Sequence, residues 1–200
     1  EGLLNYLALL GWSIGPDRDV FSLDEFTAAF DIVNVNPNPA RFDQKKAESI
    51  NGDHIRMLEP ADFAARIVPY LRAAGVVGEQ LTEREQALIA ASAPLVQERV
   101  QILGDVPGLL GFLFTDAVTY ADDALASLPA NADEVVVASV DALELVPQEE
   151  FTTAAVQTAL TTALVDELGL KPRVAFGPLR VALSGRRISP PLFESMELLG

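Results

Sequence analysis

The chain has 200 residues, half of them hydrophobic, with no cysteine, a single histidine and a formal net charge of −15. This length supports a substantial hydrophobic core in one or two domains, whereas the lack of cysteine excludes disulfide scaffolds and thiolate metal sites. A multi-histidine metal cage is excluded too, because His54 is the only histidine, and any serine-histidine triad would depend on that one residue.

The two ends and the hydropathy of the chain bear on its location. The longest apolar stretches are too short to span a bilayer, and residues 1–20 have neither the basic start nor the cleavage site of a signal peptide. We therefore expect a cytoplasmic protein with no membrane partner. The chain begins without Met inside an apolar helical run and stops at Gly200 after another, so both ends look cut.

Helical signals dominate the first quarter of the chain. Apolar spacing predicts a helix over residues 3–11, and the capping box formed by Ser22 and Glu25 predicts a second helix that ends at Phe30. Residues 31–41 alternate briefly and contain Pro37 and Pro39, which bias the preceding residues to extended conformations. We expect an irregular or short β connection there.

The next helices are marked by their caps. Asp43 is expected to cap a helix that ends at Asn51-Gly52, and Pro60 to lie in the first turn of a helix that runs to about residue 74. A capping box at Thr82 predicts another helix after the 75–81 loop. Prolines inside these patterns, at positions 69 and 94, are expected to kink or interrupt them.

The second half continues in the same way. A short apolar piece is predicted over residues 107–114, and helices over residues 132–146, 152–168 and 172–184. The three valines at 135–137 favour a strand locally, but their neighbours favour a helix. The last helix is expected to span residues 190–199, with Ser189 as its N-cap and Pro190 in its first position. The fold class is therefore mainly α.

The charge is unevenly distributed. Residues 73–170 hold sixteen acidic residues against two basic ones, whereas residues 171–187 hold five basic residues and no acid. An acidic body with a concentrated basic segment suits a protein that grips a polyanion at one place and repels it elsewhere. The alternative is an exposed segment whose arginines are solvated or paired with the acids of the middle region. Composition alone leaves both interpretations open.

Three separated motifs resemble bacterial glutamyl-tRNA synthetases. They are LLNYLALLGWS at residues 3–13, FDQKK at 42–46 followed by INGDHIR at 50–56, and PLRVALSG at 178–185 followed by PPLFE at 190–194. The similarity covers essentially the whole chain and is weakest between about residues 120 and 170. The resemblance implies a stem-contact region over residues 1–76 and an all-helical anticodon-binding domain of the α-helix-cage type over residues 77–200, incomplete at its C-terminal end.

In that family the intact enzyme attaches L-glutamate to tRNA(Glu) in two steps, using ATP and magnesium. Its HIGH-type and KMSKS-type signatures are absent from these 200 residues, and His54 is not in a HIGH-type context. The resemblance therefore implies a fragment that binds tRNA and recognises its anticodon, with no catalytic residue, cofactor or metal site of its own. It also implies a monomer whose partner is tRNA(Glu) and not DNA.

The resemblance also suggests site residues. Arg180 lies in the motif that contacts the anticodon, Ser189, Pro190 and Leu192 match the start of the following helix, and Arg99 corresponds to an arginine that inspects the third anticodon base. Contacts with the tRNA backbone are suggested for Arg41, Lys45, Lys46, Arg56, Arg186 and Arg187, since cationic side chains position RNA without reading its sequence.

Other interpretations remain open for each residue. Ser189-Pro190 could be an ordinary helix cap, Arg99 an ordinary surface arginine, and the basic residues near position 45 a solvated face. His54 and Asn51 are expected to pack or cap, and Trp12 with the phenylalanines at 21, 26, 30 and 42 is expected to be core. The alternative function is an acidic helical protein-interaction module with no tRNA role.

Overall fold

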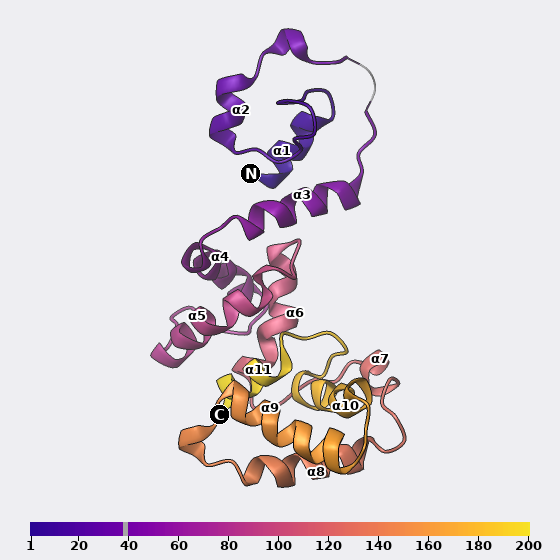
Figure 1. Cartoon of the computed structure of the whole chain (residues 1–200). Coiled ribbons are helices and arrows are strands. Elements are labelled where there is room, and N and C mark those ends of the chain that lie inside the picture. Colours follow the sequence, from indigo (N-terminus) through magenta and orange to yellow (C-terminus); the bar gives the residue numbers. More distant parts are fainter. Residues whose placement is uncertain (38–39) are drawn as a thin grey trace.

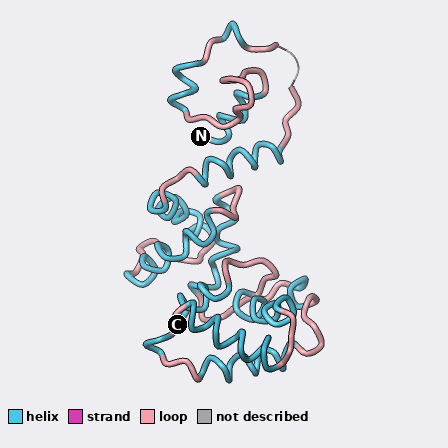
Figure 2. Tube along the Cα trace, viewed as in Figure 1, coloured by secondary structure: helices cyan, strands magenta, loops and turns pink. Residues whose placement is uncertain are grey.

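The computed structural model describes residues 1–37 and 40–200, and within them every regular element is a helix (Figures 1 and 2). The mainly α class is therefore confirmed. Asn38 and Pro39 lie outside the described residues. The irregular or short β connection expected over residues 31–41 is therefore tested only at residues 31–37 and 40–41. In the described part of residues 31–41 there is a 3₁₀ turn at Ile32–Asn34 and no strand.

The helices follow one another along an elongated molecule, with the N-terminus near one end (Figure 1). The elements of the first part are α1 (Gly2–Leu9), α2 (Leu23–Ala29) and α3 (Gln44–Arg56). Those of the middle are α4 (Pro60–Ala73), α5 (Glu83–Gln97), the 3₁₀ turn η2 (Leu103–Asp105), α6 (Val106–Leu110) and η3 (Gly111–Phe114). The last part contains α7 (Asp122–Leu125), α8 (Ala132–Glu144), η4 (Gln148–Glu150), α9 (Thr153–Thr161) with its π-helical continuation η5 (Thr162–Glu167), α10 (Pro172–Ser184) and α11 (Leu192–Leu199).

Two hydrophobic clusters hold the middle and the last parts. The first is built by α4, α5 and α6 around Phe63, which is fully buried, and the second by α8, α9, α10 and α11 around Leu160. Leu183 of α10 packs against both clusters, and so joins them. The first cluster contains residues from both sides of the 75–81 loop, because α4 and α5 pack on each other. The division into residues 1–76 and 77–200 stays a prediction.

Local cap signals were reliable predictors of where helices begin. Both predicted capping boxes are present, at Ser22 with Glu25 and at Thr82 with Glu85. The backbone N–H of Ser22, followed by the guanidinium of Arg18, lowers the pKa of Glu25 to about 2. Asp43 caps α3 through its side chain as predicted, and the helix over residues 132–146 is observed as α8.

Three predicted features are wrong. The helix that was expected to end at Asn51-Gly52 continues to Arg56; Gly52 is buried within α3, which packs on α1. The interruption expected at Pro94 is also absent, because α5 continues through it to Gln97; the alternative, a kink at Pro94, stays a prediction. Gln97 holds the last turn by donating hydrogen bonds to the carbonyls of Ile55 and Leu58 at 3.0 and 2.8 Å.

The third is the core position expected for two phenylalanines: Phe42 is 54% exposed and packs edge-on against Tyr6, and Phe30 is 41% exposed. The aromatic cluster around Trp12 is otherwise internal as predicted: Trp12 and Phe21 are buried and pack against Phe26. Phe30 packs on the same cluster at its exposed edge.

A polar network fastens α1 to α3. Asn5 is buried, donates to the carbonyl of Asp19 at 2.9 Å and accepts the backbone N–H of Phe21 at 3.1 Å. The Nε2 atom of His54 lies 2.8 Å from the Oδ1 atom of the same Asn5 side chain. Because that oxygen is an acceptor, the imidazole donates from Nε2, which gives His54 the packing role expected from the sequence.

The position of His54 predicts how stability depends on pH. Burial lowers the pKa of the imidazole from its ordinary value of 6.5, against the opposing effect of the Glu1 and Asp53 carboxylates. The fold therefore favours neutral His54, so this contribution to stability is complete above pH 6.5 and decreases as the pH falls from there toward the lowered pKa. We expect His54→Gln to lose less unfolding free energy than the parent between pH 7.5 and 5.5, measured by urea denaturation; equal losses would contradict the assignment.

Candidate nucleic-acid interface

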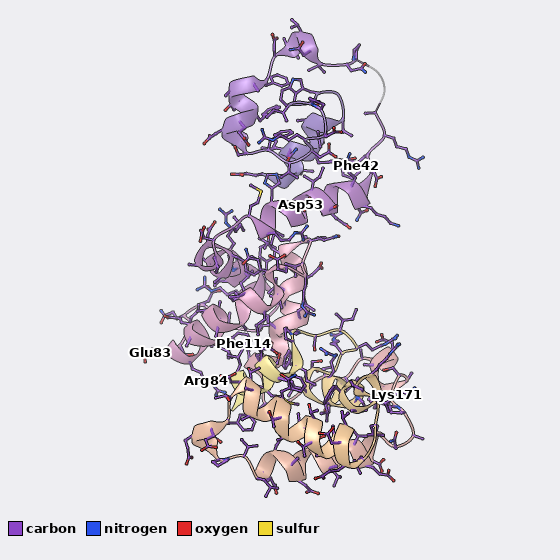
Figure 3. The ribbon with its side chains drawn as sticks, in the orientation of Figure 1. Phe42, Asp53, Glu83, Arg84, Phe114 and Lys171 are labelled. Carbon is purple, nitrogen blue, oxygen red and sulfur yellow. The ribbon has the colours of Figure 1, made fainter. Side chains whose placement is uncertain are left out.

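The basic segment begins on α10, which is built to present arginines on one side. Lys171 and Pro172 begin this helix, which buries Ala175, Leu179 and Val181 in the second cluster. The helix ends at Gly185, whose φ of +67° turns the chain away so that Arg186 and Arg187 follow outside it, both exposed. Figure 3 shows Lys171 at the outer edge of the last part of the molecule.

Four predicted residues meet at one turn, and one of them, Arg99, comes from a distant part of the sequence. Arg180 donates from Nη1 to the Ser189 hydroxyl at 2.8 Å and to the Pro190 carbonyl at 3.0 Å. Arg99, which comes just after α5, donates from Nη1 to the Ser189 carbonyl at 3.4 Å. Residues 189–190 are therefore held between two guanidinium groups from α10 and the end of α5.

The two guanidinium groups raise the positive potential at this turn. Burial, and then the nearby charge of Arg99, lower the pKa of Arg180 from its ordinary value. Both groups bond to neutral oxygens rather than to carboxylates. Within residues 1–37 and 40–200, no ion pair involves Arg99, Arg180 or any arginine of residues 171–187. The positive charge therefore stays uncompensated by direct contacts.

Two hollows lie beside this turn and share a residue. One, of about 580 Å³, is lined by Arg173, Arg180 and Arg187, together with the 127–129 segment opposite. The other, of about 820 Å³, is lined by Arg99, Arg186 and Arg187 and also by Asp105 and Asp123. Since Arg187 lines both, the five arginines form one surface, called the arginine surface below: Arg99, Arg173, Arg180, Arg186 and Arg187.

The start of α11 differs from the prediction. The helix begins at Leu192 with Pro191 as its N-cap, so the expected helix start at Pro190 and the N-cap role of Ser189 are wrong. The reason is the proline pair: Ser189 and Pro190 each precede a proline, which disfavours helical conformation at both. The Ser189 hydroxyl is instead engaged by Arg180 and donates to the Pro190 carbonyl.

Burial separates the predicted anticodon residues into two groups. Ser189 is 3% exposed and Leu192 is 4% exposed, the latter inside the second hydrophobic cluster. Arg99 is exposed and Arg180 half-buried, with the latter's Nε and Nη2 atoms unpaired within the described part of the chain. Of these residues the arginines are the more accessible, whereas Ser189 and Pro190 hold Arg180 through hydrogen bonds and Leu192 packs in the second cluster. Direct ligand contacts by the latter three stay predictions.

The predicted backbone-contact residues of the first part lie far from the arginine surface along the molecule. In Figure 3 Phe42 and Asp53 mark their place on α3 and just before it. Arg41 and Lys45 are exposed and line a hollow of about 730 Å³. Lys46 pairs with Asp19 at 3.0 Å, and Arg56 with Asp53 at 2.6 Å. A role in RNA contact stays a prediction for all four basic residues.

Arg173, which lines the same hollow as Arg180, is not among the site residues predicted from the sequence. The signal was available: positions 173, 177 and 180 of one helix are spaced i, i+4 and i+7 and therefore share a face. The described residues contain no group of three or more His, Asp or Glu side chains placed to hold a metal ion. No helix among them has the length and apolarity needed to cross a membrane.

Comparisons with known proteins agree with this geometry. The model of a family described as an anticodon binding domain matches residues 62–200. A glutamate-tRNA ligase of Leifsonia xyli subsp. xyli is 68% identical over an alignment that covers 100% of this chain and 41% of that protein. One from Kocuria rhizophila is 59% identical, with 100% and 40% covered. The chain thus spans about two fifths of the length of these relatives.

A solved structure has the same fold. The crystal structure of the glutamate-tRNA synthetase from Elizabethkingia anophelis superposes with a TM-score of 0.75 at 21% sequence identity, covering 100% of this chain and 38% of that chain. At this identity the likeness concerns the arrangement of the helices alone. It agrees with the all-helical architecture expected from the sequence.

Proposed function

Because the chain belongs to the family of anticodon-binding domains, we propose that it binds the anticodon loop of a tRNA through the arginine surface. The observation that carries the proposal is the meeting of Arg99 and Arg180 at the Ser189-Pro190 turn, where no carboxylate of the described residues pairs with either. RNA phosphates are attracted to such a surface, whereas the acidic remainder of the chain repels them. The alternative of an acidic module with no tRNA role is not favoured by the family match.

Arg180 is suited to reading a base. One edge of its guanidinium, through Nη1, is used to hold residues 189–190, which fixes the plane of the group. The Nε and Nη2 atoms form the other edge, and two parallel donors of this kind match two acceptors on a base or a phosphate. Unpaired bases of a loop expose such acceptors, which paired RNA hides in a narrow groove.

The longer protein is proposed to be a glutamate-tRNA ligase, as its relatives are named. In this proposal it attaches L-glutamate to tRNA(Glu) with ATP and magnesium, as a cytoplasmic monomer, and this chain contributes tRNA binding. The described part of this chain offers no side-chain cluster for a metal ion, so no step that uses magnesium is assigned to its residues.

The test is the salt dependence of RNA binding. If the five arginines contact about five phosphates, the logarithm of the affinity for an anticodon stem-loop should fall against the logarithm of salt concentration with a slope of about −3.5. Replacing Arg186 and Arg187 by glutamine should reduce that slope by about 1.4. Fluorescence anisotropy with labelled RNA at several salt concentrations measures both.

A matched control is Arg84→Gln. Arg84 is at the start of α5, on the opposite side of Figure 3 from Lys171, and lines neither hollow. This variant should bind RNA with the slope of the parent chain. A salt-independent complex, or equal effects of the Arg84 and the Arg186/Arg187 variants, would count against the arginine surface.

A further inference from the structure

A groove on the last part of the molecule is unrelated to the arginine surface. It runs between α8 and the helix formed by α9 and η5, has a volume of about 530 Å³, and has alanines on both walls, among them Ala142 and Ala163. Leu145 and Leu168 line it and are 84% and 52% exposed. Large apolar side chains exposed together beside a concave surface are typical of an interaction site.

The backbone beside the groove is unusual. From Thr162 to Glu167 the helix is of the π type, and the N–H of Leu168 reaches back to the carbonyl of Ala163 at 3.3 Å. Single π turns are rare and are found frequently at functional sites. This one carries Ala163 and Glu167 into the wall of the groove.

The charge around the groove determines what can enter it. Asp141 and Glu167 line it, and residues 100–170 as a whole hold twelve acidic residues and no lysine, arginine or histidine. RNA and anionic lipid surfaces are repelled by this charge, and so is the same groove of a second copy. A ligand that complements both the leucines and the carboxylates is apolar on one side and cationic on its flanks.

We propose that this groove is a docking site for a basic amphipathic helix of a partner protein. Apolar side chains of the partner at positions i, i+3, i+4 and i+7 lie against Leu145, Leu168 and the alanine walls. Its lysines or arginines lie beside Asp141 and Glu167. The proposal does not depend on tRNA binding, because none of the five arginines lines the groove.

The experiment uses the full chain and a labelled synthetic peptide of about five helical turns, with leucines in the i, i+3, i+4, i+7 pattern and lysines elsewhere. Fluorescence anisotropy is expected to show saturable binding of this probe. A scrambled peptide of the same composition, which lacks an apolar face, and an amphipathic peptide with glutamates in place of the lysines should both bind at least about tenfold more weakly. Equal binding of the scrambled peptide, binding of the acidic peptide, or no binding of the probe would overturn the proposal.

Two variants locate the site. Leu145→Ser removes an exposed side chain that belongs to neither core cluster, and should lower the affinity for the probe about tenfold. The double variant Asp141→Lys with Glu167→Lys should lower the affinity for the basic probe to a similar extent and raise the affinity for the acidic peptide. Val33→Ser is the matched control, since Val33 is 80% exposed in the first part of the molecule.

The expected pattern is loss of probe binding in the groove variants only, with binding of the anticodon stem-loop unchanged in Leu145→Ser and Val33→Ser. An equal loss in Val33→Ser, or a change smaller than about twofold in Leu145→Ser, would overturn the assignment to this groove. Self-association that sedimentation equilibrium detects in the parent chain and that Leu145→Ser abolishes would show a second copy as the occupant instead. Failure of stem-loop binding alone would bear on the proposed function and leave this proposal standing.

Discussion

Arg180→Ala is expected to weaken binding of the anticodon stem-loop by about 1–3 kcal/mol and to relax the preference for one anticodon. Its guanidinium is held by Ser189 and Pro190 at 2.8 and 3.0 Å, so its free edge is already oriented when RNA arrives. The substitution removes two donors from that edge and a positive charge. Titration of labelled stem-loops that differ only in the anticodon measures affinity and preference together.

Arg180→Lys distinguishes reading from simple attraction. Lysine keeps the charge but cannot offer two parallel donors, so a base-reading Arg180 predicts nearly the same loss of preference as in Arg180→Ala. Binding by the lysine variant with the affinity and preference of the parent would show that the residue supplies charge alone. Ser189→Ala serves as a positioning control, because it removes one hydrogen-bond partner of Nη1 and leaves the guanidinium in place. It should lower the affinity for the stem-loop less than Arg180→Ala does.

Arg99 is expected to behave differently from Arg180. It is exposed just after α5 and donates to the Ser189 carbonyl at 3.4 Å. Its charge also lowers the pKa of Arg180, so the two residues share one local potential. In a double-mutant cycle, substitutions of the two arginines should therefore be non-additive for stem-loop binding, as expected for side chains in one network.

What the sequence predicted well depends on short-range interactions. The capping boxes at Ser22 and Thr82 involve residues three positions apart, and the helix ends at Gly75, Gly169 and Gly185 need only a positive φ at one residue. The concentration of basic residues at 171–187 was likewise visible in the sequence. Such features are specified by neighbours along the chain, so no tertiary information is needed.

What the sequence could not predict depends on packing between distant segments. Asn51-Gly52 has the composition of a helix end, yet α1 packs closely on α3 there, and a Cβ atom on Gly2 would lie 2.7 Å from the Cα atom of Asn51. Arg99 and Ser189 are 90 positions apart and meet only because α11 packs against both α5 and α10. No spacing rule relates residues so far apart, and only the resemblance to a known family had suggested that Arg99 and Arg180 act together.

Gly185→Ala is expected to destabilise the chain by about 2–5 kcal/mol, more than most surface substitutions. Gly185 ends α10 with a φ of +67°, a conformation that is unfavourable for alanine. A Cβ atom there would also overlap the carbonyl oxygen of Thr119, in a segment fixed by the hydrogen bond from the Ala121 N–H to the Gly185 carbonyl at 3.0 Å. Urea denaturation measures the loss.

Gly177→Ala is the matched control, because it makes the same chemical change in the same helix. A Cβ atom on Gly177 meets no other atom within 4 Å, and alanine favours a helix interior over glycine by about 1 kcal/mol, so this variant should be slightly more stable than the parent. Because Gly185 directs Arg186 and Arg187 out of α10, Gly185→Ala should also weaken stem-loop binding under conditions where it remains folded. If Gly185→Ala were as stable as the parent chain, the 117–121 segment would have moved to make room for the Cβ atom at little cost in free energy. The turn at Gly185 would then not fix the positions of these two arginines.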